Sequence, residues 1–368
     1  MQRALVLYVD DGVSDESLRL AGSFLPDVLC ERLISSGVAD GVLFSLPASY
    51  NGALSAHADA VTREGDDISH WKALADKSGA QHFVRIFADS PFIDKSIIAE
   101  MISIHEKYLA EFTYSENIPG GLSCEIFSAE LIHNLPSEGD NRLPLSQVIR
   151  SNINQFDVEL FYKGPDIRDK RIFFRGKNAR EKKYMEELHA RIGRFPEYGE
   201  LRKLIEDNSD LLYAGPSYLE IEVSGKADVE AIYSWRKGVK KIRGDMPVPL
   251  FRKMIADMAA FSLPYSICLG GSGDPLCNGS FYEILDCARS ESLITTIFIE
   301  TDGTRCDANF TGYLSRVNDP RITVIVDCSG YDDKSYASLY SADRFAEVKK
   351  NILSVRDAMG GNAKNLYI

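Results

Sequence analysis

The scarcity of basic residues, long apolar runs and regularly spaced cysteines in this sequence excludes several classes of protein. Basic residues are outnumbered, with 42 Lys and Arg against 54 Asp and Glu and a formal net charge of −12, which argues against a nucleic-acid-binding surface. No uninterrupted apolar run reaches the roughly 20 residues of a membrane span. The seven cysteines are an odd number without regular spacing, so they give no disulfide framework. We expect a cytoplasmic protein without a membrane span or a nucleic-acid partner.

The first half of the chain alternates strand and helix signals. Apolar runs predict strands at 4–9, 41–45 and 82–87, and apolar residues at i, i+3 and i+4 predict helices at 27–36, 70–78 and 94–108. Such alternation with short connections is typical of a mostly parallel sheet that is covered by helices on both faces. We therefore predict an open, doubly wound α/β fold for this half.

The same alternation restarts after Gly215-Pro216. Apolar runs predict further strands at 218–223, 266–269, 295–299, 322–326 and 365–368. A chain of 368 residues is long enough for two cores, and Gly-Pro is a strong break between elements. We predict a first domain at 1–192, a helical linker at 193–216 and a second domain at 217–368.

One stretch of the first domain carries a chemical signal. In VRIFADSPFID (84–94) an apolar strand brings Asp89 to its carboxyl end, where open α/β sheets bind their ligands. Mg²⁺ takes one or two carboxylates together with phosphate oxygens. From the residues alone, a magnesium ligand and a cap for the helix that begins near Asp94 are equally good interpretations of Asp89.

Residues 1–192 resemble the cytidylyltransferases of sugar-nucleotide synthesis, particularly the spore-coat polysaccharide type. The resemblance lies in DVLCERLISSGVADGVLFSLP (27–47), GDDISHWKALADKSGAQHFVRIFADSPFID (65–94) and GGLSCEIFSAELI (120–132). It implies a Rossmann-like nucleotide-diphospho-sugar transferase fold and a nucleotide or nucleotide-sugar ligand. It also implies that Asp89 binds Mg²⁺ and that Glu125 lines the sugar side of the site.

Two features depart from that family's pattern. The loop after the first strand, VDDGVSDESLRLAG (9–22), replaces the family's glycine- and arginine-containing nucleotide loop. It carries the carboxylates of Asp10, Asp11, Asp15 and Glu16 with Arg19 as its one cation, and like charges repel a triphosphate. The family's second metal-binding Asp corresponds to Arg175. We therefore expect four carboxylates to face the cleft and Mg²⁺ to bind poorly.

The second domain resembles the core of the radical S-adenosylmethionine superfamily. The resemblance lies in ICLGGSGDPLCNGSFYEILDCA (267–288), IFIETDGT (297–304) and ITVIVDCSGYDDKSYASLYSADRFAEVKKNI (322–352). It implies a partial (β/α) barrel of about five strands. It also implies a vestigial cofactor loop at Gly270, Gly271, Gly273 and Asp274, whose acid would balance the cofactor's ammonium group.

The cluster-binding cysteines of that superfamily are missing. Ala227, Ala231 and Ser234 occupy the three positions of the C-x₃-C-x₂-C spacing. Alanine has no ligand atom and serine is a poor iron ligand, so we expect no iron–sulfur cluster and no radical chemistry.

The combination of the two halves resembles the spiro-SPASM proteins. There, a barrel without a cluster precedes a cysteine-rich C-terminal domain, which this sequence does not contain. Ending at Ile368 would leave an apolar edge strand uncovered, so we expect a truncated chain. The basic residues Lys237, Lys240, Lys241 and Arg243 could meet an anion or the missing domain.

Three functions remain open from the sequence. The leading prediction is a pseudoenzyme, a binding or scaffold protein with an unknown protein partner. The first alternative is an active nucleotidyltransferase for CMP-sugar synthesis that uses Asp89 for Mg²⁺. The second alternative is a barrel that binds S-adenosylmethionine for non-radical purposes, which depends on residues 270–274 alone.

Overall fold

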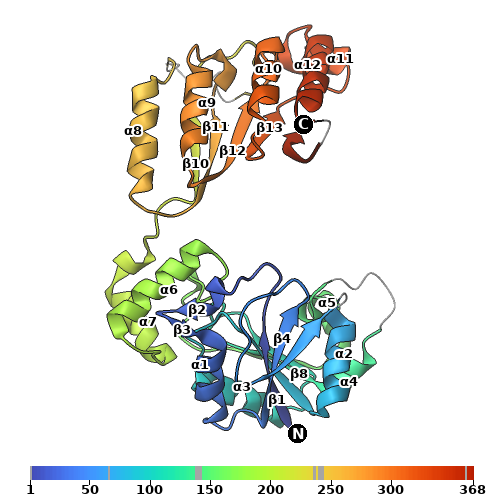
Figure 1. The fold of residues 1–368 in the computed structure, drawn as a ribbon. Helices are drawn as coiled ribbons and strands as arrows, with labels where there is room; N and C mark the ends of the chain where they lie inside the picture. Colours follow the sequence, from blue (N-terminus) through green and yellow to red (C-terminus); the bar gives the residue numbers. More distant parts are fainter. Residues whose placement is uncertain (1, 65–66, 137–142, 235–237, 239–243, 361–362) are drawn as a thin grey trace. The chain divides into compact units, whose positions relative to one another are not determined.

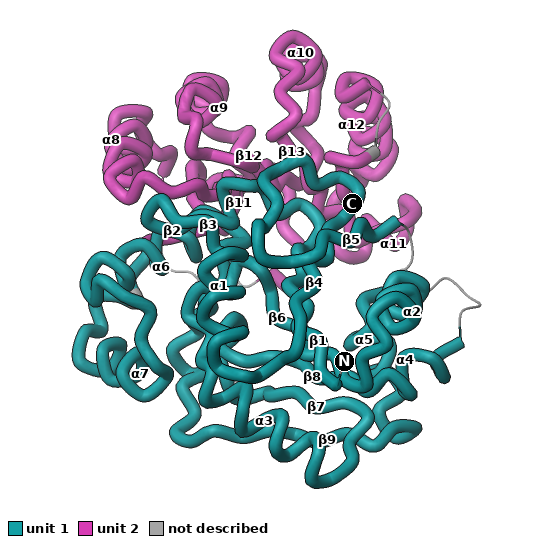
Figure 2. The backbone as a smooth tube through the Cα atoms, turned by 60° about the horizontal axis from the view of Figure 1, so that its bottom comes forward, with its two compact units in different colours: residues 1–214 teal, residues 215–368 magenta. Residues whose placement is uncertain are grey.

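The computed structural model describes residues 2–64, 67–136, 143–234, 238, 244–360 and 363–368. The basic residues Lys237, Lys240, Lys241 and Arg243 lie outside these ranges. The chain forms two compact units, Met1–Ala214 and Gly215–Ile368, which are coloured separately in Figure 2. Both are α/β, as predicted. Among the described residues, no helix combines the length and apolar character that crossing a bilayer requires.

Unit 1 is built on a seven-stranded sheet in the order β5-β4-β1-β6-β8-β7-β9. Its strands are β1 (Arg3–Tyr8), β4 (Gly41–Pro47), β5 (Asp59–Arg63), β6 (His82–Phe87), β7 (Phe112–Ser115), β8 (Glu125–Ser128) and β9 (Val158–Phe161). Only β8 runs antiparallel to its neighbours in the described pairings. The chain adds strands on one side of β1 and then crosses to the other side with β6, so the topological switch point lies between β1 and β6.

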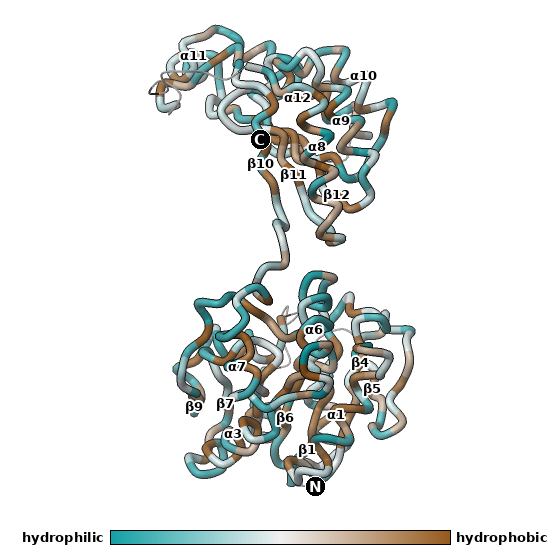
Figure 3. Tube along the Cα trace, turned by 90° about the vertical axis from the view of Figure 1, so that its left-hand side faces the viewer, coloured by the Kyte–Doolittle hydropathy of each residue, from teal (hydrophilic) through white to brown (hydrophobic). Residues whose placement is uncertain are grey.

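Helices cover both faces of this sheet (Figure 1). They are α1 (Leu25–Ile34), α2 (Asp67–Ser78), α3 (Lys95–Lys107), α4 (Ala129–Asn134), α5 (Leu145–Ser151), α6 (Ala179–Ile192) and α7 (Tyr198–Asp207). Side chains alternate along β1: Leu5 and Leu7 pack into a core with α1, α3, α6 and α7, whereas Ala4 and Val6 pack with α2, α4 and α5. Hydrophobic residues accordingly run along β1 and β6 (Figure 3). The predicted doubly wound fold is confirmed.

The predicted helical linker at 193–216 is wrong for most of its length. Tyr198, Leu201 and Ile205 of α7, together with Leu211, belong to the core of unit 1. The backbone amide of Tyr198 also donates to the Asp94 carboxylate at 2.6 Å. The apolar face of α7 has to be buried somewhere, and it is buried against the first sheet, so unit 1 extends to Ala214.

Unit 2 contains a five-stranded sheet whose strands follow in chain order and are all parallel. They are β10 (Tyr218–Glu222), β11 (Tyr265–Gly270), β12 (Ile294–Thr301), β13 (Ile322–Val326) and β14 (Leu366–Tyr367). Helices α8 (Val248–Ala259), α9 (Phe281–Ser290), α10 (Ala308–Val317), α11 (Asp333–Tyr340) and α12 (Phe345–Ala358) connect them and share one core with one face of the sheet. This is the partial (β/α) barrel that the sequence predicted (Figure 1).

Candidate functional site

Two carboxylates stand at the switch point of unit 1. Asp10 follows β1 and Asp89 follows β6, and the two segments stay together because the Ala88 amide donates to the Tyr8 carbonyl at 2.9 Å. The side chain of Asp89 is 1% exposed and that of Asp10 is 23% exposed. The sequence prediction therefore placed Asp89 correctly at the carboxyl end of its strand, where ligands of such sheets bind.

Arg175 joins these two carboxylates. Its Nε donates to Asp89 Oδ1 at 3.0 Å, and its Nη2 donates to Asp10 Oδ2 at 2.8 Å and to Asp89 Oδ2 at 3.3 Å. The guanidinium carbon lies 3.6 Å from the centre of the Phe87 ring. A rigid fork of donors matches carboxylate oxygens well. The positive charge between the two acids is thus supplied by the protein's own side chain.

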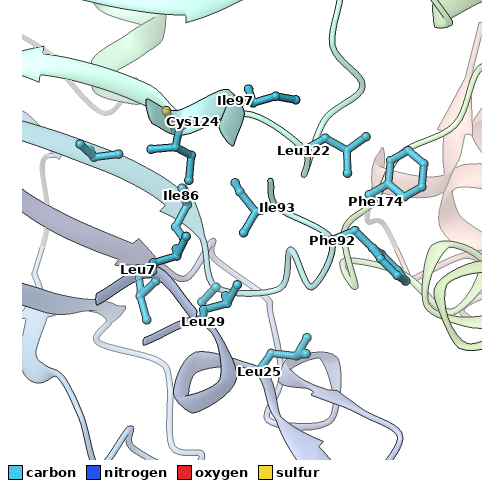
Figure 4. Packing of buried hydrophobic residues seen from close by; sticks show 14 of the residues in the cluster. Leu7, Leu25, Leu29, Ile86, Phe92, Ile93, Ile97, Leu122, Cys124 and Phe174 are labelled. Atoms are coloured by element: carbon cyan, nitrogen blue, oxygen red, sulfur yellow. The ribbon is translucent and has the colours of Figure 1, made fainter. Parts of the chain in front are cut away.

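The segment around Arg175 is fixed by backbone contacts on both sides. The Phe174 amide donates to the Gly120 carbonyl at 2.7 Å, and the Gly176 amide donates to the Asp89 carbonyl at 2.9 Å. Phe174 is fully buried and lies close to Leu122 and Phe92 (Figure 4). Gly121 has φ +91°, and a Cβ there would lie 2.2 Å from the Phe174 carbonyl oxygen. This close approach requires glycine, and it holds Arg175 against the acids.

Burial and the guanidinium act on Asp89 in opposite directions. Loss of solvent raises the pKa of the Asp89 carboxyl above its ordinary value, and the charge of Arg175 lowers it. Without that cation, ionisation of this carboxyl would cost much more, because nearly no water reaches it.

The sequence predicted that the four carboxylates of the loop after β1 face the cleft, with Arg19 as the loop's one cation. Asp10 and Asp11 do line a cavity, but the charges of all four carboxylates are compensated. Each has a basic partner: Asp10 pairs with Arg175, Asp11 with Arg63, Asp15 with Arg19 and Glu16 with Lys182. Asp15 also accepts from the Ala53 amide at 2.8 Å. Most of these cations come from distant parts of the chain, so the loop alone gave a misleading picture of its charge.

Glu125 lies at the start of β8, opposite Arg85 of β6. Its carboxylate forms a salt bridge with Arg85 and another with Arg150, whose Nη2 lies 3.2 Å from Oε1. A cavity of about 560 Å³ lies beside it, lined by Tyr8, Asp10, Asp11, Arg85, Phe87, Glu125, Pro144, Ser146, Gln147, Arg150 and Lys177. Asp89 is not among the lining residues. The structure therefore brings Glu125 and Asp10 to one cavity, while Asp89 is covered by Arg175.

A second cavity, of about 270 Å³, lies at the carboxyl ends of the unit 2 strands. Its lining includes Ala227, Ala231 and Ser234 from the loop after β10. It also includes Gly271, Gly273 and Asp274 of the glycine-rich loop; Gly270, the last residue of β11, is not a lining residue. The two loops that the sequence singled out therefore meet at one place.

The glycines of this loop serve close packing against the segment after β10. A Cβ on Gly273 would lie 2.2 Å from the Ser224 carbonyl oxygen, and Gly271 has φ +100°. The Asp274 carboxylate accepts from the Leu276 amide at 2.7 Å, from Thr301 Oγ1 at 2.6 Å and from the Asp302 amide at 2.9 Å. Both of its oxygens are thus committed to the protein. Burial, together with the neighbouring charge of Asp302, raises the pKa of Asp274 to about 7.

We expect the protein to stay colourless when it is purified anaerobically with iron and sulfide. Ala227 and Ala231 offer no ligand atom at two of the three positions for a cluster. In the described part of the chain, no three His, Cys, Asp or Glu side chains are grouped as metal ligands would be. Absorbance spectroscopy with iron quantification checks this, and a stoichiometric iron–sulfur band would contradict it.

No protein-family model matches this chain, and no curated protein matches it. Among solved structures, it is similar to a cytidylyltransferase from Leptospira borgpetersenii serovar Hardjo-bovis (strain JB197), with 15% identity and a TM-score of 0.49 over 58% of this chain and 97% of that one. It is also similar to a histidine-tagged form of anSMEcpe with bound AdoMet, with 18% identity and a TM-score of 0.35 over 39% of this chain and 41% of that one.

A third similar structure is Streptococcus suis SuiB bound to precursor peptide SuiA, with 16% identity and a TM-score of 0.33. It covers 44% of this chain and 35% of that one. The chain thus spans about two fifths or less of the length of anSMEcpe and SuiB. The assignment of the two folds rests on the strand order and connectivity given above.

Proposed function

We propose that this protein is a non-catalytic binding or scaffold protein. In this proposal unit 1 keeps the fold of a nucleotidyltransferase without its metal chemistry, and unit 2 keeps a partial barrel without a cluster. The observation that carries the proposal is the contact of Arg175 with both Asp89 and Asp10. The pairing of the two folds supports membership of the spiro-SPASM proteins, which stays a proposal.

The Arg175 contacts argue against a magnesium site at Asp89. Mg²⁺ needs near-octahedral oxygen ligands at about 2.0–2.1 Å. A metal ion at this position would have to compete with the guanidinium of Arg175 for the carboxylate oxygens, and the guanidinium already donates to three of the four. A second cation in the same space would also be repelled by the first. Any nucleotide or sugar phosphate that unit 1 binds would therefore bind without a metal at Asp89.

The two alternatives have weaker support. An active nucleotidyltransferase would need Arg175 to leave both acids before Asp89 could bind Mg²⁺, and the anchored backbone of residues 174–176 opposes that movement. A non-radical S-adenosylmethionine site would need Asp274 to meet the cofactor's ammonium group. The oxygens of Asp274 already accept three internal hydrogen bonds.

Melting of the full chain with CTP and Mg²⁺ tests this proposal. A site occupied at about 100 times its dissociation constant would add about 2.7 kcal/mol to the free energy of unfolding. We expect no change in the melting temperature of unit 1 with CTP and Mg²⁺, as with Mg²⁺ alone. A magnesium-dependent rise with CTP that ATP does not produce would favour the active nucleotidyltransferase instead.

A further inference from the structure

The chain contains two asparagines that are followed directly by glycine, Asn51 in unit 1 and Asn278 in unit 2. In such a dipeptide the glycine nitrogen can attack the asparagine side chain and displace its amide group. Glycine favours this attack, because it has no side chain that hinders its nitrogen and because its backbone adopts many conformations. The surroundings of the two dipeptides are opposite, so their reactivity should differ.

Asn51 lies in the connection between β4 and β5, outside any helix or strand, and its side chain is exposed. Within the ranges that the structure describes, neither the side-chain amide of Asn51 nor the backbone amide of Gly52 has a hydrogen-bond partner. The carbon that would be attacked and the nitrogen that would attack it are therefore not held by other groups, and solvent reaches the Asn51 side chain.

Asn278 is buried and held by hydrogen bonds. It is 4% exposed, and its Nδ2 donates to the carbonyl oxygens of Val223 at 2.7 Å and Met246 at 3.1 Å. The backbone amide of Gly279 points to the Asp245 carboxylate as a hydrogen-bond donor. Groups that are committed in this way react only when the surrounding structure opens. The fold therefore protects the second dipeptide and not the first.

Packing explains why glycine stands at position 52. A Cβ on Gly52 would lie 2.5 Å from the hydroxyl oxygen of Tyr50 and 2.8 Å from Cβ of Asp15. Any other residue would displace both side chains, because close-packed atoms leave no room for the extra carbon. The glycine that makes Asn51 reactive is thus required by the structure, whereas the exposed Asn51 side chain is not.

We propose that Asn51 is a modification site that converts spontaneously into aspartate and isoaspartate. The Gly52 nitrogen forms a bond to Cγ of Asn51, the bond between Cγ and Nδ2 breaks, and ammonia leaves with the proton of the Gly52 amide. The succinimide that results is opened by a water molecule. Attack of water at Cγ gives aspartate, whereas attack at the main-chain carbonyl carbon gives isoaspartate, in which the backbone runs through the side chain.

Isoaspartate would break the contacts that hold this connection to the loop after β1. The Ala53 amide donates to Asp15 Oδ1 at 2.8 Å, and the Tyr50 hydroxyl donates to the Ala53 carbonyl at 2.9 Å. Isoaspartate adds a carbon to the backbone between Tyr50 and Ala53, which moves Ala53 away from both partners. Asp15 would keep its hydrogen bond from Arg19, so the change separates the two loops without leaving that carboxylate unpaired.

The conversion takes place in one loop of unit 1 and is independent of the binding role proposed above. Its tests and the nucleotide tests can therefore fail separately.

Peptide mass spectrometry of the full chain tests the conversion. The folded protein is incubated in water enriched in heavy oxygen, which labels every succinimide that opens during the incubation, and is then digested at acidic pH. We expect the peptide with Asn51 to gain label at least about tenfold faster than the peptide with Asn278, because only the second must wait for an opening. The label at Asn51 should appear in two isomers, and its rate should rise with pH, because the attacking nitrogen must lose its proton.

Urea supplies the matched control, because the unfolded chain exposes both dipeptides alike. In urea the two labelling rates should agree within about threefold. Asn51→Gln should abolish labelling at this position and leave the melting temperature unchanged, since the Asn51 side chain has no hydrogen-bond partner among the described residues. Equal rates in the folded protein, faster labelling at Asn278, or a tenfold difference that persists in urea would overturn the proposal.

Hydrogen exchange measures the structural consequence. In the isoaspartate form, isolated by chromatography, the Ala53 amide should exchange at least about tenfold faster than in fresh protein, because it loses its bond to Asp15. Asn51→Asp carries the same new charge on an ordinary backbone and should keep the exchange of this amide slow. Equal exchange of Ala53 in fresh protein and in the isoaspartate form would contradict the release of the loop.

Discussion

Replacing Arg175 with methionine is expected to lower the free energy of unfolding of unit 1 by about 3–5 kcal/mol, the usual cost of removing one partner from a buried ion pair. The change leaves Asp89, which is 1% exposed, without a counter-ion. Of the salt bridges that Asp10 forms with described residues, the one with Lys177 would remain, with Nζ 3.5 Å from the carboxylate. Methionine keeps an unbranched side chain against Phe87, so the loss reports the charge. Urea denaturation followed by circular dichroism measures it.

The deficit of this variant should depend on pH. The folded-state pKa of Asp89 is raised by burial, and it rises further when Arg175 is removed. A carboxyl whose folded pKa exceeds its unfolded value of about 4 loses stability as pH rises above that unfolded value and through the folded one. The free energy of unfolding of Arg175→Met should therefore fall further below that of the wild type as the pH rises. Adding Asp89→Asn to Arg175→Met should remove the pH dependence and recover much of the stability. A deficit below about 1 kcal/mol that ignores pH would contradict the account.

Replacing Arg175 with aspartate should create a divalent metal site at the position where we propose that the guanidinium keeps a metal out of the wild type. The new carboxylate would join those of Asp10 and Asp89, which Arg175 now holds together. Three carboxylates without a cation repel one another, so the variant should be unstable until a metal binds. We expect Mn²⁺ to raise its melting temperature, by an amount equivalent to about 2.7 kcal/mol at 100 times the dissociation constant. Differential scanning calorimetry with and without Mn²⁺ measures this.

Lys177→Asp provides the matched control for the metal gain. It makes the same change of charge two residues away, at a side chain that is 55% exposed. It should gain no Mn²⁺-dependent stability, because its carboxylate does not replace the guanidinium between the two acids. An equal Mn²⁺ effect in wild type and in Arg175→Asp would show that Arg175 does not occupy a metal position.

The fold was largely predictable because its signals are local. Apolar runs such as 4–9 and 82–87 fall within the strands β1 and β6 to within a residue or two. The carboxyl end of β6 located Asp89 from sequence alone. The restart after Gly215 matched the second unit because Gly-Pro breaks an element whatever surrounds it.

The charge balance of the site was not predictable in the same way. Arg63 pairs with Asp11 across 52 residues and Lys182 with Glu16 across 166. Because these cations are so distant in the sequence, the sequence of the loop after β1 did not show that its negative charges are compensated. Arg175 was identified as a departure from a family pattern, but its contact with Asp10 was not. The burial of α7 was not predicted, because its acidic sequence was interpreted as a linker between domains. Tyr198, Leu201 and Ile205 nevertheless lie on one face of this helix.

We propose that Arg175 excludes metal-dependent nucleotide chemistry from unit 1. Isothermal titration calorimetry of the wild-type chain with CTP in the presence of Mg²⁺ tests it most directly. We predict no saturable heat, or a dissociation constant on the order of millimolar, which corresponds to only about −4 kcal/mol of binding free energy. Micromolar binding that requires Mg²⁺ and is lost in Asp89→Asn would contradict the claim.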